Sequence, residues 1–164
     1  ISTRSAAAIA GHAALDAYAP HAGQVDGVLL ACFGDPGLLA LRELADRPVL
    51  GLAEAACQEA AKGGRRFSII TGGQLWPPML EELLATLGLS GSLASIRAVA
   101  PTGGEIAANP AAAHDVLANA ALDAVREDGA EAAILGGAGL VGIAGAIRSR
   151  IPVPVLCSVE AGFQ

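Results

Sequence analysis

Residues 28–37 read VLLACFGDPG, a short apolar run that leads into a turn containing glycine, aspartate and proline. Such a run is typical of a strand that is buried on both faces of a parallel sheet. We therefore predict a strand at residues 28–32, a turn at 34–37 and a helix at 38–45. Pro36 suits the first position of that helix, because its missing N–H has no partner there.

The same alternation of apolar runs and helical segments continues on both sides of this stretch. Helices are expected at residues 2–19, with Ser2 or Thr3 as the N-cap, and at 38–45, 54–62, 77–87, 111–127 and 140–148. Strands are expected at 28–32, 48–52, 66–71, 93–99, 132–136 and 153–157, and residues 101–109 are expected to form a loop. Strands that alternate with helices predict right-handed crossovers and parallel sheets, so the fold class is α/β.

Two parts of the chain repeat each other. Residues 28–34 (VLLACFG) align with 133–139 (AILGGAG) at an offset of 105, and 48–55 align with 154–161 at an offset of 106. The repeat indicates two α/β lobes of similar topology, whose strand-end loops would face one cleft. The alternative is a coincidence between two generic βαβ units.

The composition limits the kinds of partner. The chain has 164 residues, a net charge of −6 and 53% hydrophobic residues, much of it alanine. A nucleic acid or an anionic membrane would need a basic patch, and no run reaches the roughly 18 apolar residues of a membrane-spanning helix. We expect a small-molecule substrate, no nucleic-acid partner and no membrane partner.

The cysteines and the amino terminus bear on the compartment. Three cysteines at wide spacing match neither a disulfide framework nor a zinc site, so we expect a cytoplasmic protein that binds no metal. The first residues contain neither an initiator Met nor a secretory signal. We expect that the sequence begins after processing, truncation or disorder.

Cys32 is the residue to which chemistry is most easily assigned. It lies at the carboxyl end of a predicted strand and just before a predicted helix, where backbone N–H groups and the helix dipole would lower the pKa of the thiol. A thiolate there could act as a general base or as a nucleophile. The alternative is a small buried side chain without a chemical role.

Several stretches together carry a family resemblance. They are ACFGDPGL (31–38), PVLGLAEAA (48–56), RRFSIITGG (65–73), LWPPMLEELL (75–84), ILGGAGLVG (134–142) and IPVPVLCSV (151–159). From about Gly27 to the carboxyl terminus the chain resembles the aspartate/glutamate/hydantoin racemase superfamily, and above all its hydantoin and allantoin racemase branch. This resemblance implies two flavodoxin-like lobes with pseudo-twofold symmetry. The first lobe would comprise residues 1–65, completed by 158–164 and lacking its amino-terminal strand, and the second would comprise 66–157.

The resemblance also implies a mechanism and a set of site residues. Members of this superfamily use no cofactor, and a cysteine from each lobe faces the acidic carbon of the substrate. Cys32 falls on the first cysteine position, whereas the second, in a motif resembling L-G-C-A-G, is occupied by Gly137. The substrate-binding positions implied are Phe33, Gly34, Thr71, Gly72 and Ala138.

Gly137 leaves more than one function open, since a glycine supplies no proton to the far face of the substrate. The first hypothesis is a racemase of hydantoin, allantoin or amino-acid derivatives, impaired by the missing cysteine. The alternatives are a single-cysteine decarboxylase or lyase-like relative and a catalytically silent ligand-binding homologue. The family is compatible with a homo-oligomer, which the sequence leaves open.

Other residues have two interpretations. Trp76 is either an aromatic residue at the edge of the pocket or a packing residue where a helix begins. Asp35 is either a helix cap or a catalytic carboxylate. Cys157 would lie one strand away from the Gly137 loop, and Cys57 is expected in the core.

Overall fold

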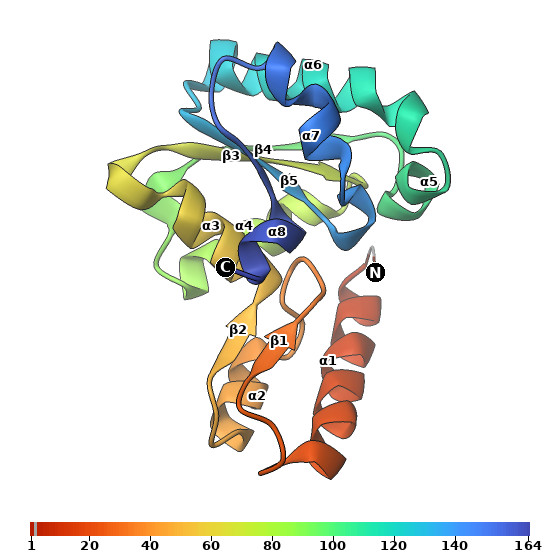
Figure 1. Cartoon of the computed structure of the whole chain (residues 1–164), viewed down its shortest axis with the longest axis vertical. Coiled ribbons are helices and arrows are strands. Elements are labelled where there is room, and N and C mark those ends of the chain that lie inside the picture. The colour runs from red at the N-terminus through yellow and green to blue at the C-terminus, as the bar shows by residue number, and fades with distance from the viewer. Residues whose placement is uncertain (2) are drawn as a thin grey trace.

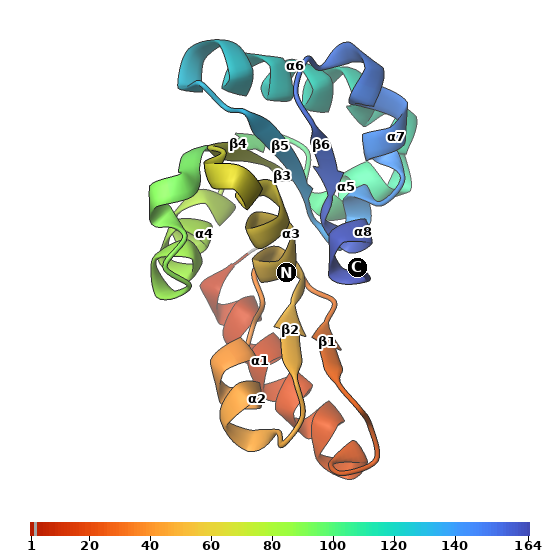
Figure 2. The ribbon, with the colours of Figure 1, turned by 60° about the vertical axis from the view of Figure 1, so that its left-hand side comes forward.

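The computed structural model describes residue 1 and residues 3–164, and it contains two parallel sheets that lie one above the other along the long axis (Figure 1). We call the two-stranded sheet with α1 and α2 the small lobe. The four-stranded sheet with the helices packed on it is the large lobe. Both ends of the chain lie near the junction of the lobes in both views (Figures 1 and 2).

The small lobe is built around two short parallel strands. Its elements are α1 (Arg4–Tyr18), a 3-10 turn (Ala19–His21), β1 (Val28–Leu30), α2 (Leu38–Leu44) and β2 (Val49–Gly51). Thr3 caps α1 by accepting a hydrogen bond from the Ala6 N–H at 3.2 Å, as one of the two expected caps. Ser2, the other candidate, lies outside the described residues.

The large lobe has the strand order β4-β3-β5-β6, with every pairing parallel. Its strands are β3 (Phe67–Gly72), β4 (Leu93–Val99), β5 (Ala132–Gly136) and β6 (Val155–Cys157). Its helices are α3 (Leu52–Ala60), α4 (Trp76–Thr86), α5 (Gly103–Ala108), α6 (Pro110–Asp128), α7 (Ile143–Ile147) and α8 (Ser158–Gly162), with 3-10 turns at Lys62–Gly64, Ser90–Ser92, Ala138–Leu140 and Arg148–Arg150. The predicted α/β class with parallel sheets is therefore confirmed.

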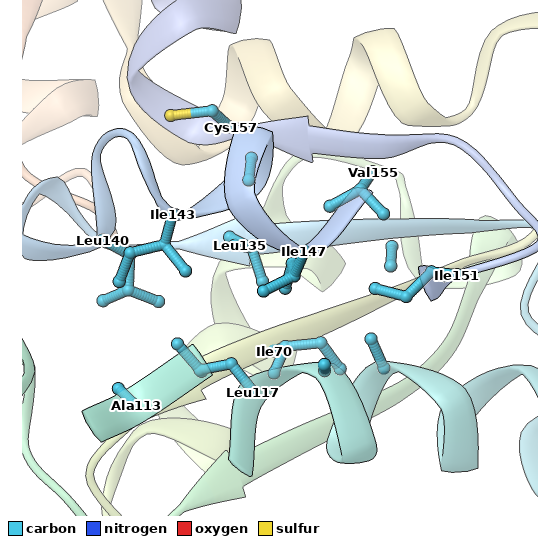
Figure 3. Close-up of a cluster of buried hydrophobic side chains, with 14 of the residues drawn as sticks. Ile70, Ala113, Leu117, Leu135, Leu140, Ile143, Ile147, Ile151, Val155 and Cys157 are labelled. Atoms are coloured by element: carbon cyan, nitrogen blue, oxygen red, sulfur yellow. The ribbon is translucent and has the colours of Figure 1, made fainter. Parts of the chain in front are cut away.

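Helices cover both faces of the large sheet. On one face α6 and α7 pack against Ile70 and Leu135 (Figure 3), and on the other α3 and α4 pack against Ile69 and Ile134. Adjacent residues of one strand point to opposite faces, and here both faces are buried. For this reason the central strand β5 is an uninterrupted apolar run, whereas the edge strand β4 is only partly buried and carries Ser95 and Arg97.

The internal repeat reappears in the register of the sheets. Val28 pairs with Val49 in the small lobe, and Ala133 pairs with Val155 in the large lobe. These pairs are related by the offsets of 105 and 106 that the aligned residues show. The two-lobe pseudo-symmetry expected from the sequence is thus present in the strand pairing.

Several sequence-based boundaries need correction: α3 begins and ends two residues earlier than expected, and α8 was not expected. Residues 101–109, expected to be a loop, contain α5, because Thr102 and Glu105 form a capping box and Ile106 is buried in the core. The helix expected at 140–148 is shorter, since a 3-10 turn and Gly142, with a positive φ, precede α7. The division into 1–65 with 158–164 and 66–157 stays a prediction; α3 and α8 pack against each other and both contact β5.

Asp35 joins the loop after β1 to the first turn of α3. Its carboxylate accepts hydrogen bonds from the N–H groups of Ala53 and Glu54, both at 2.8 Å. The N-cap position of α3 is Gly51, which has no side chain to do this. A methyl group on Gly51 would overlap the Asp35 carboxylate, so the glycine makes room for a cap supplied from another loop. Of the two interpretations of Asp35, the helix cap is the one that the structure supports.

We predict that Asp35 makes stability depend on pH. Burial raises the pKa of its carboxyl to about 6, although the two N–H donors oppose that shift. Since this folded-state pKa lies above that of the unfolded chain, the contribution of Asp35 is largest below pH 4 and is lost as the pH rises through 6. At about 1.4 kcal/mol per unit of pKa, the loss is roughly 3 kcal/mol.

Asp35→Asn removes this titration. Urea unfolding of the wild type and the variant between pH 4 and pH 8 should show the stability of the wild type falling relative to the variant over that interval. Parallel pH profiles for the two proteins would contradict the assignment.

Candidate active site

A cavity of about 310 Å³ lies where the two lobes meet. The small lobe contributes the loop after β1, and the large lobe contributes the loops after β3, β4 and β5. All of these loops follow the carboxyl ends of parallel strands, where ligands bind in open α/β sheets. The lining residues are Ile1, Ala31, Cys32, Phe33, Thr71, Gly72, Trp76, Gly103, Gly104, Ala107, Gly136, Gly137, Ala138, Gly139 and Leu140.

Cys32 is held by a tight turn at the edge of this cavity. Its carbonyl accepts a hydrogen bond from the Asp35 N–H at 3.0 Å, and the Asp35 carboxylate is anchored on α3. The cysteine side chain is partly buried. The small lobe thus presents one thiol to the cavity from a loop that the large lobe helps to fix.

The expected lowering of the Cys32 pKa is not found. Burial raises the pKa of the thiol, the charge of the amino terminus opposes this, and the Asp35 carboxylate adds to it. Helix α2 begins at Leu38, after a left-handed Gly37, so Cys32 does not lie in the first turn of a helix. The dipole of a helix acts mainly within its first turn, which explains the wrong direction of the prediction.

Gly137 lies in the loop after β5, at the position of the sequence repeat that corresponds to Cys32. Its backbone has φ +146°, a conformation that L side chains rarely adopt. Its N–H donates to the hydroxyl of Ser158, a buried residue at the start of α8, at 3.2 Å. The two positions of the implied cysteine pair, Cys32 and Gly137, therefore line one cavity from different lobes.

The other predicted site residues are placed as follows. Phe33, Thr71, Gly72 and Ala138 line the cavity, whereas Gly34 is not part of its lining. Phe33 is only 4% exposed, and its ring occupies the space that a side chain at Gly136 would take.

Thr71 and the backbone define the polar part of the site. The Thr71 hydroxyl donates to the Gly136 carbonyl at 2.8 Å and so ties the end of β3 to the end of β5. In the described part of the chain, the backbone N–H groups of Phe33 and Ala138 have no protein acceptor. Both donors belong to residues of the lining.

Trp76 has both of the roles that were considered for it. It lines the cavity, and it is also part of the core below the large sheet, with 8% of its surface exposed. Its ring packs over Gly34, where an added methyl group would come within 2.5 Å of Cζ3. Gly34 therefore allows the indole to close one side of the cavity.

The remaining cysteines are in the core. Cys57 and Cys157 are buried in the clusters on the two faces of the large sheet, and neither lines the cavity. Among the residues described, no three His, Cys, Asp or Glu side chains are grouped as they would be around a metal ion. In the same part of the chain no helix is long and apolar enough to cross a membrane.

Sequence reasoning missed the contribution of α5, which adds Gly103, Gly104 and Ala107 to the lining. The signal was present as Thr102-x-x-Glu105 after an apolar strand, a pattern typical of a helix start. The adjacent glycines favoured a loop instead.

Comparisons with known proteins agree with this architecture. The family model for Asp/Glu/hydantoin racemases matches residues 1–164. The hydantoin racemase of Paenarthrobacter aurescens is 44% identical over 141 residues, which cover 85% of this chain and 59% of that protein. The chain thus spans less than two thirds of this relative.

Two solved structures have the same fold. The allantoin racemase of Klebsiella pneumoniae superposes with a TM-score of 0.90 at 34% identity, covering 99% of this chain and 66% of that one. The allantoin racemase of Pseudomonas fluorescens gives a TM-score of 0.89 at 34% identity, covering 94% and 66%. Because the family model spans the whole sequence and these relatives share both its residues and its fold, the chain belongs to the Asp/Glu/hydantoin racemase family.

Proposed function

We propose that this chain carries the catalytic base of a cofactor-independent racemase that acts on the acidic carbon of a hydantoin-type ring. The observation that carries the proposal is the thiol of Cys32 at the cavity between the lobes. Among the described lining residues, no other side chain is acidic or basic. Proton transfer to or from a ligand in this cavity therefore has one side chain to use. The names of the relatives, hydantoin racemase and allantoin racemase, support a ring of this class.

The proposed first step is removal of a proton from the ring carbon next to a carbonyl. The Cys32 thiolate takes the proton, and the electron pair of the C–H bond moves onto the carbonyl oxygen as an enolate. The free N–H groups of Phe33 and Ala138 suit that oxygen, because donors fixed in advance stabilise charge as it develops. We assign Thr71 and Gly72, at the end of β3, to binding of the same ring, and Gly34 to the support of Trp76.

The proposed second step is return of a proton to the carbon. Inversion needs a donor on the face opposite Cys32, and the corresponding position, Gly137, has no side chain. The Cys32 thiol can return its proton only to the face from which it came. Exchange of the ring proton with solvent should therefore run faster than racemisation.

We predict that exchange depends on Cys32. With one enantiomer of a 5-substituted hydantoin in D₂O, Cys32→Ser should lower the rate of deuterium uptake by about 10²–10⁴-fold, the usual effect of losing a positioned acid or base. Because burial raises the pKa of the thiol, wild-type exchange should rise about tenfold per pH unit toward a pKa above the ordinary value of about 8.5.

The matched control is Cys157→Ala, which removes a thiol that does not line the cavity. Nuclear magnetic resonance follows deuterium uptake, and polarimetry follows racemisation in the same sample. Uptake that is equal in Cys32→Ser and in wild type would refute the role of Cys32.

Gly137→Cys is expected to restore inversion at some cost in stability. The φ of +146° and the Leu140 side chain, 3.1 Å from an added Cβ, oppose any side chain at this position. The strain should lower the free energy of unfolding by about 1–3 kcal/mol. Racemisation should rise toward the rate of exchange, as measured by polarimetry beside deuterium uptake. A folded variant that exchanges deuterium without any gain in racemisation would argue against a proton donor at this position.

The second candidate is a decarboxylation, which needs a proton on one face only. Burial raises the pKa of Cys32 and so favours the neutral thiol, the form that donates a proton. In this reaction the bond to a carboxylate breaks, CO₂ leaves, and the electron pair stays on carbon as an enolate. The thiol then protonates the carbon, and the thiolate recovers a proton from water.

An aryl-substituted malonic acid tests this candidate. Decarboxylation should give one enantiomer, and its rate should fall as the pH rises through the pKa of Cys32, opposite to the trend for a base. Release of CO₂ is measured directly, and chiral chromatography measures the enantiomers. A racemic product excludes the candidate, and absence of both CO₂ release and hydantoin exchange would leave a ligand-binding homologue.

A further inference from the structure

The glycines of the cavity lining differ in how strictly the backbone requires them. At three of them an added methyl group would collide with a neighbour: with the Pro101 carbonyl oxygen at Gly72 (2.6 Å), with the Phe33 ring at Gly136 (2.5 Å) and with the Gly103 carbonyl oxygen at Gly139 (2.7 Å). A fourth, Gly137, has a φ of +146°. Close packing or backbone conformation thus accounts for glycine at these four positions.

Gly103 and Gly104 are different. A methyl group added at either position meets no heavy atom within 4 Å, and neither residue has a positive φ. Both belong to the first turn of α5, which the capping box of Thr102 and Glu105 holds in place. Glycine lowers helix stability relative to alanine, so the fold gains nothing from it here. The missing side chains instead leave space.

That space belongs to the cavity. Gly103, Gly104 and Ala107 are spaced i, i+1 and i+4, so they share one side of the helix, and all three line the cavity. Ile106, on another side of the same helix, is buried in the core of the large lobe. We call Gly103, Gly104 and Ala107 the α5 wall. The same lining includes Cys32 on the small lobe and Trp76 on α4.

We infer that the α5 wall receives the substituent that the substrate carries on its acidic carbon, and that the two glycines admit a bulky, apolar one. The inference rests on the proposed function, because it takes Cys32 as the group that faces the acidic carbon. A cavity of about 310 Å³ is at the lower end of the range of ligand sites. Its size therefore depends strongly on whether the wall carries side chains. The wall itself bears no polar side-chain atom, which suits an aryl or alkyl group.

The test compares two ring substrates that differ only in this substituent, 5-methylhydantoin and 5-benzylhydantoin. Gly103→Leu and Gly104→Leu should each shift the ratio of kcat/KM for deuterium exchange by about 10–200-fold against the benzyl compound, the range for steric discrimination in an apolar pocket. Gly91→Leu is the matched control, because Gly91 also has open space around it but lies outside the cavity lining. It should leave the ratio unchanged.

Binding separates this inference from the proposed function. Titration calorimetry on the wild type and the three variants gives the dissociation constants of both hydantoins without any turnover. Suppose that the wild type catalyses no exchange but that the α5 variants selectively lose affinity for the benzyl compound. The proposed function is then refuted, and the assignment of the α5 wall as the binding site of the substituent is supported. Equal effects of the α5 variants on both compounds, or no binding of either compound to the wild type, would overturn the inference. Gly103→Ala and Gly104→Ala, which add one methyl group each, should give the same trend at a smaller size if a leucine variant does not fold.

Discussion

The placement of the loop that carries Cys32 depends on one carboxylate, that of Asp35. It accepts hydrogen bonds from two N–H groups in the first turn of α3. The N–H of the same aspartate donates a hydrogen bond to the carbonyl of Cys32, three residues earlier. The loop of the small lobe is thereby fixed to a helix that packs on the large sheet. The arrangement requires Gly51, since any side chain there would occupy the position of the carboxylate. Burying this acid is costly, as its raised pKa indicates, and the hydrogen bonds from the Ala53 and Glu54 N–H groups offset part of that cost.

The location of the cavity is the usual one for parallel sheets, and its distinguishing feature is how few large or polar side chains line it. Parallel strands direct the loops at their carboxyl ends toward one region, as in other α/β proteins. Here those loops are made mainly of glycine and alanine, so the polar groups of the lining are those of the backbone, the Thr71 hydroxyl and the Cys32 thiol. Under the proposed function, a cysteine at position 137 would add a proton donor to the second face of the substrate, at the cost of backbone strain and a close contact with Leu140.

Most of the fold could be predicted because its signals are local. The six strands overlap the six segments predicted as strands, and the repeat at offsets of 105 and 106 reappears as equal register in the two sheets. The α5 segment was missed because two glycines outweighed a capping box, and only the burial of Ile106 decides in favour of a helix. Cys32 and four of the five expected binding positions line one cavity, whereas Gly34 supports Trp76 from outside the lining.

The amino-acid sequence was sufficient to predict the α/β class, the family resemblance, the cysteine in the first of the repeated strand-end loops and the glycine at the matching position of the second. These are properties of residue type and spacing, which the chain carries before it folds. Tertiary structure alone decided that Asp35 caps a helix from a distant loop, that burial raises rather than lowers the pKa of Cys32, and that Gly103 and Gly104 open onto the cavity. Each of these depends on which atoms approach from other parts of the chain, and desolvation, capping and free volume have no counterpart in local sequence.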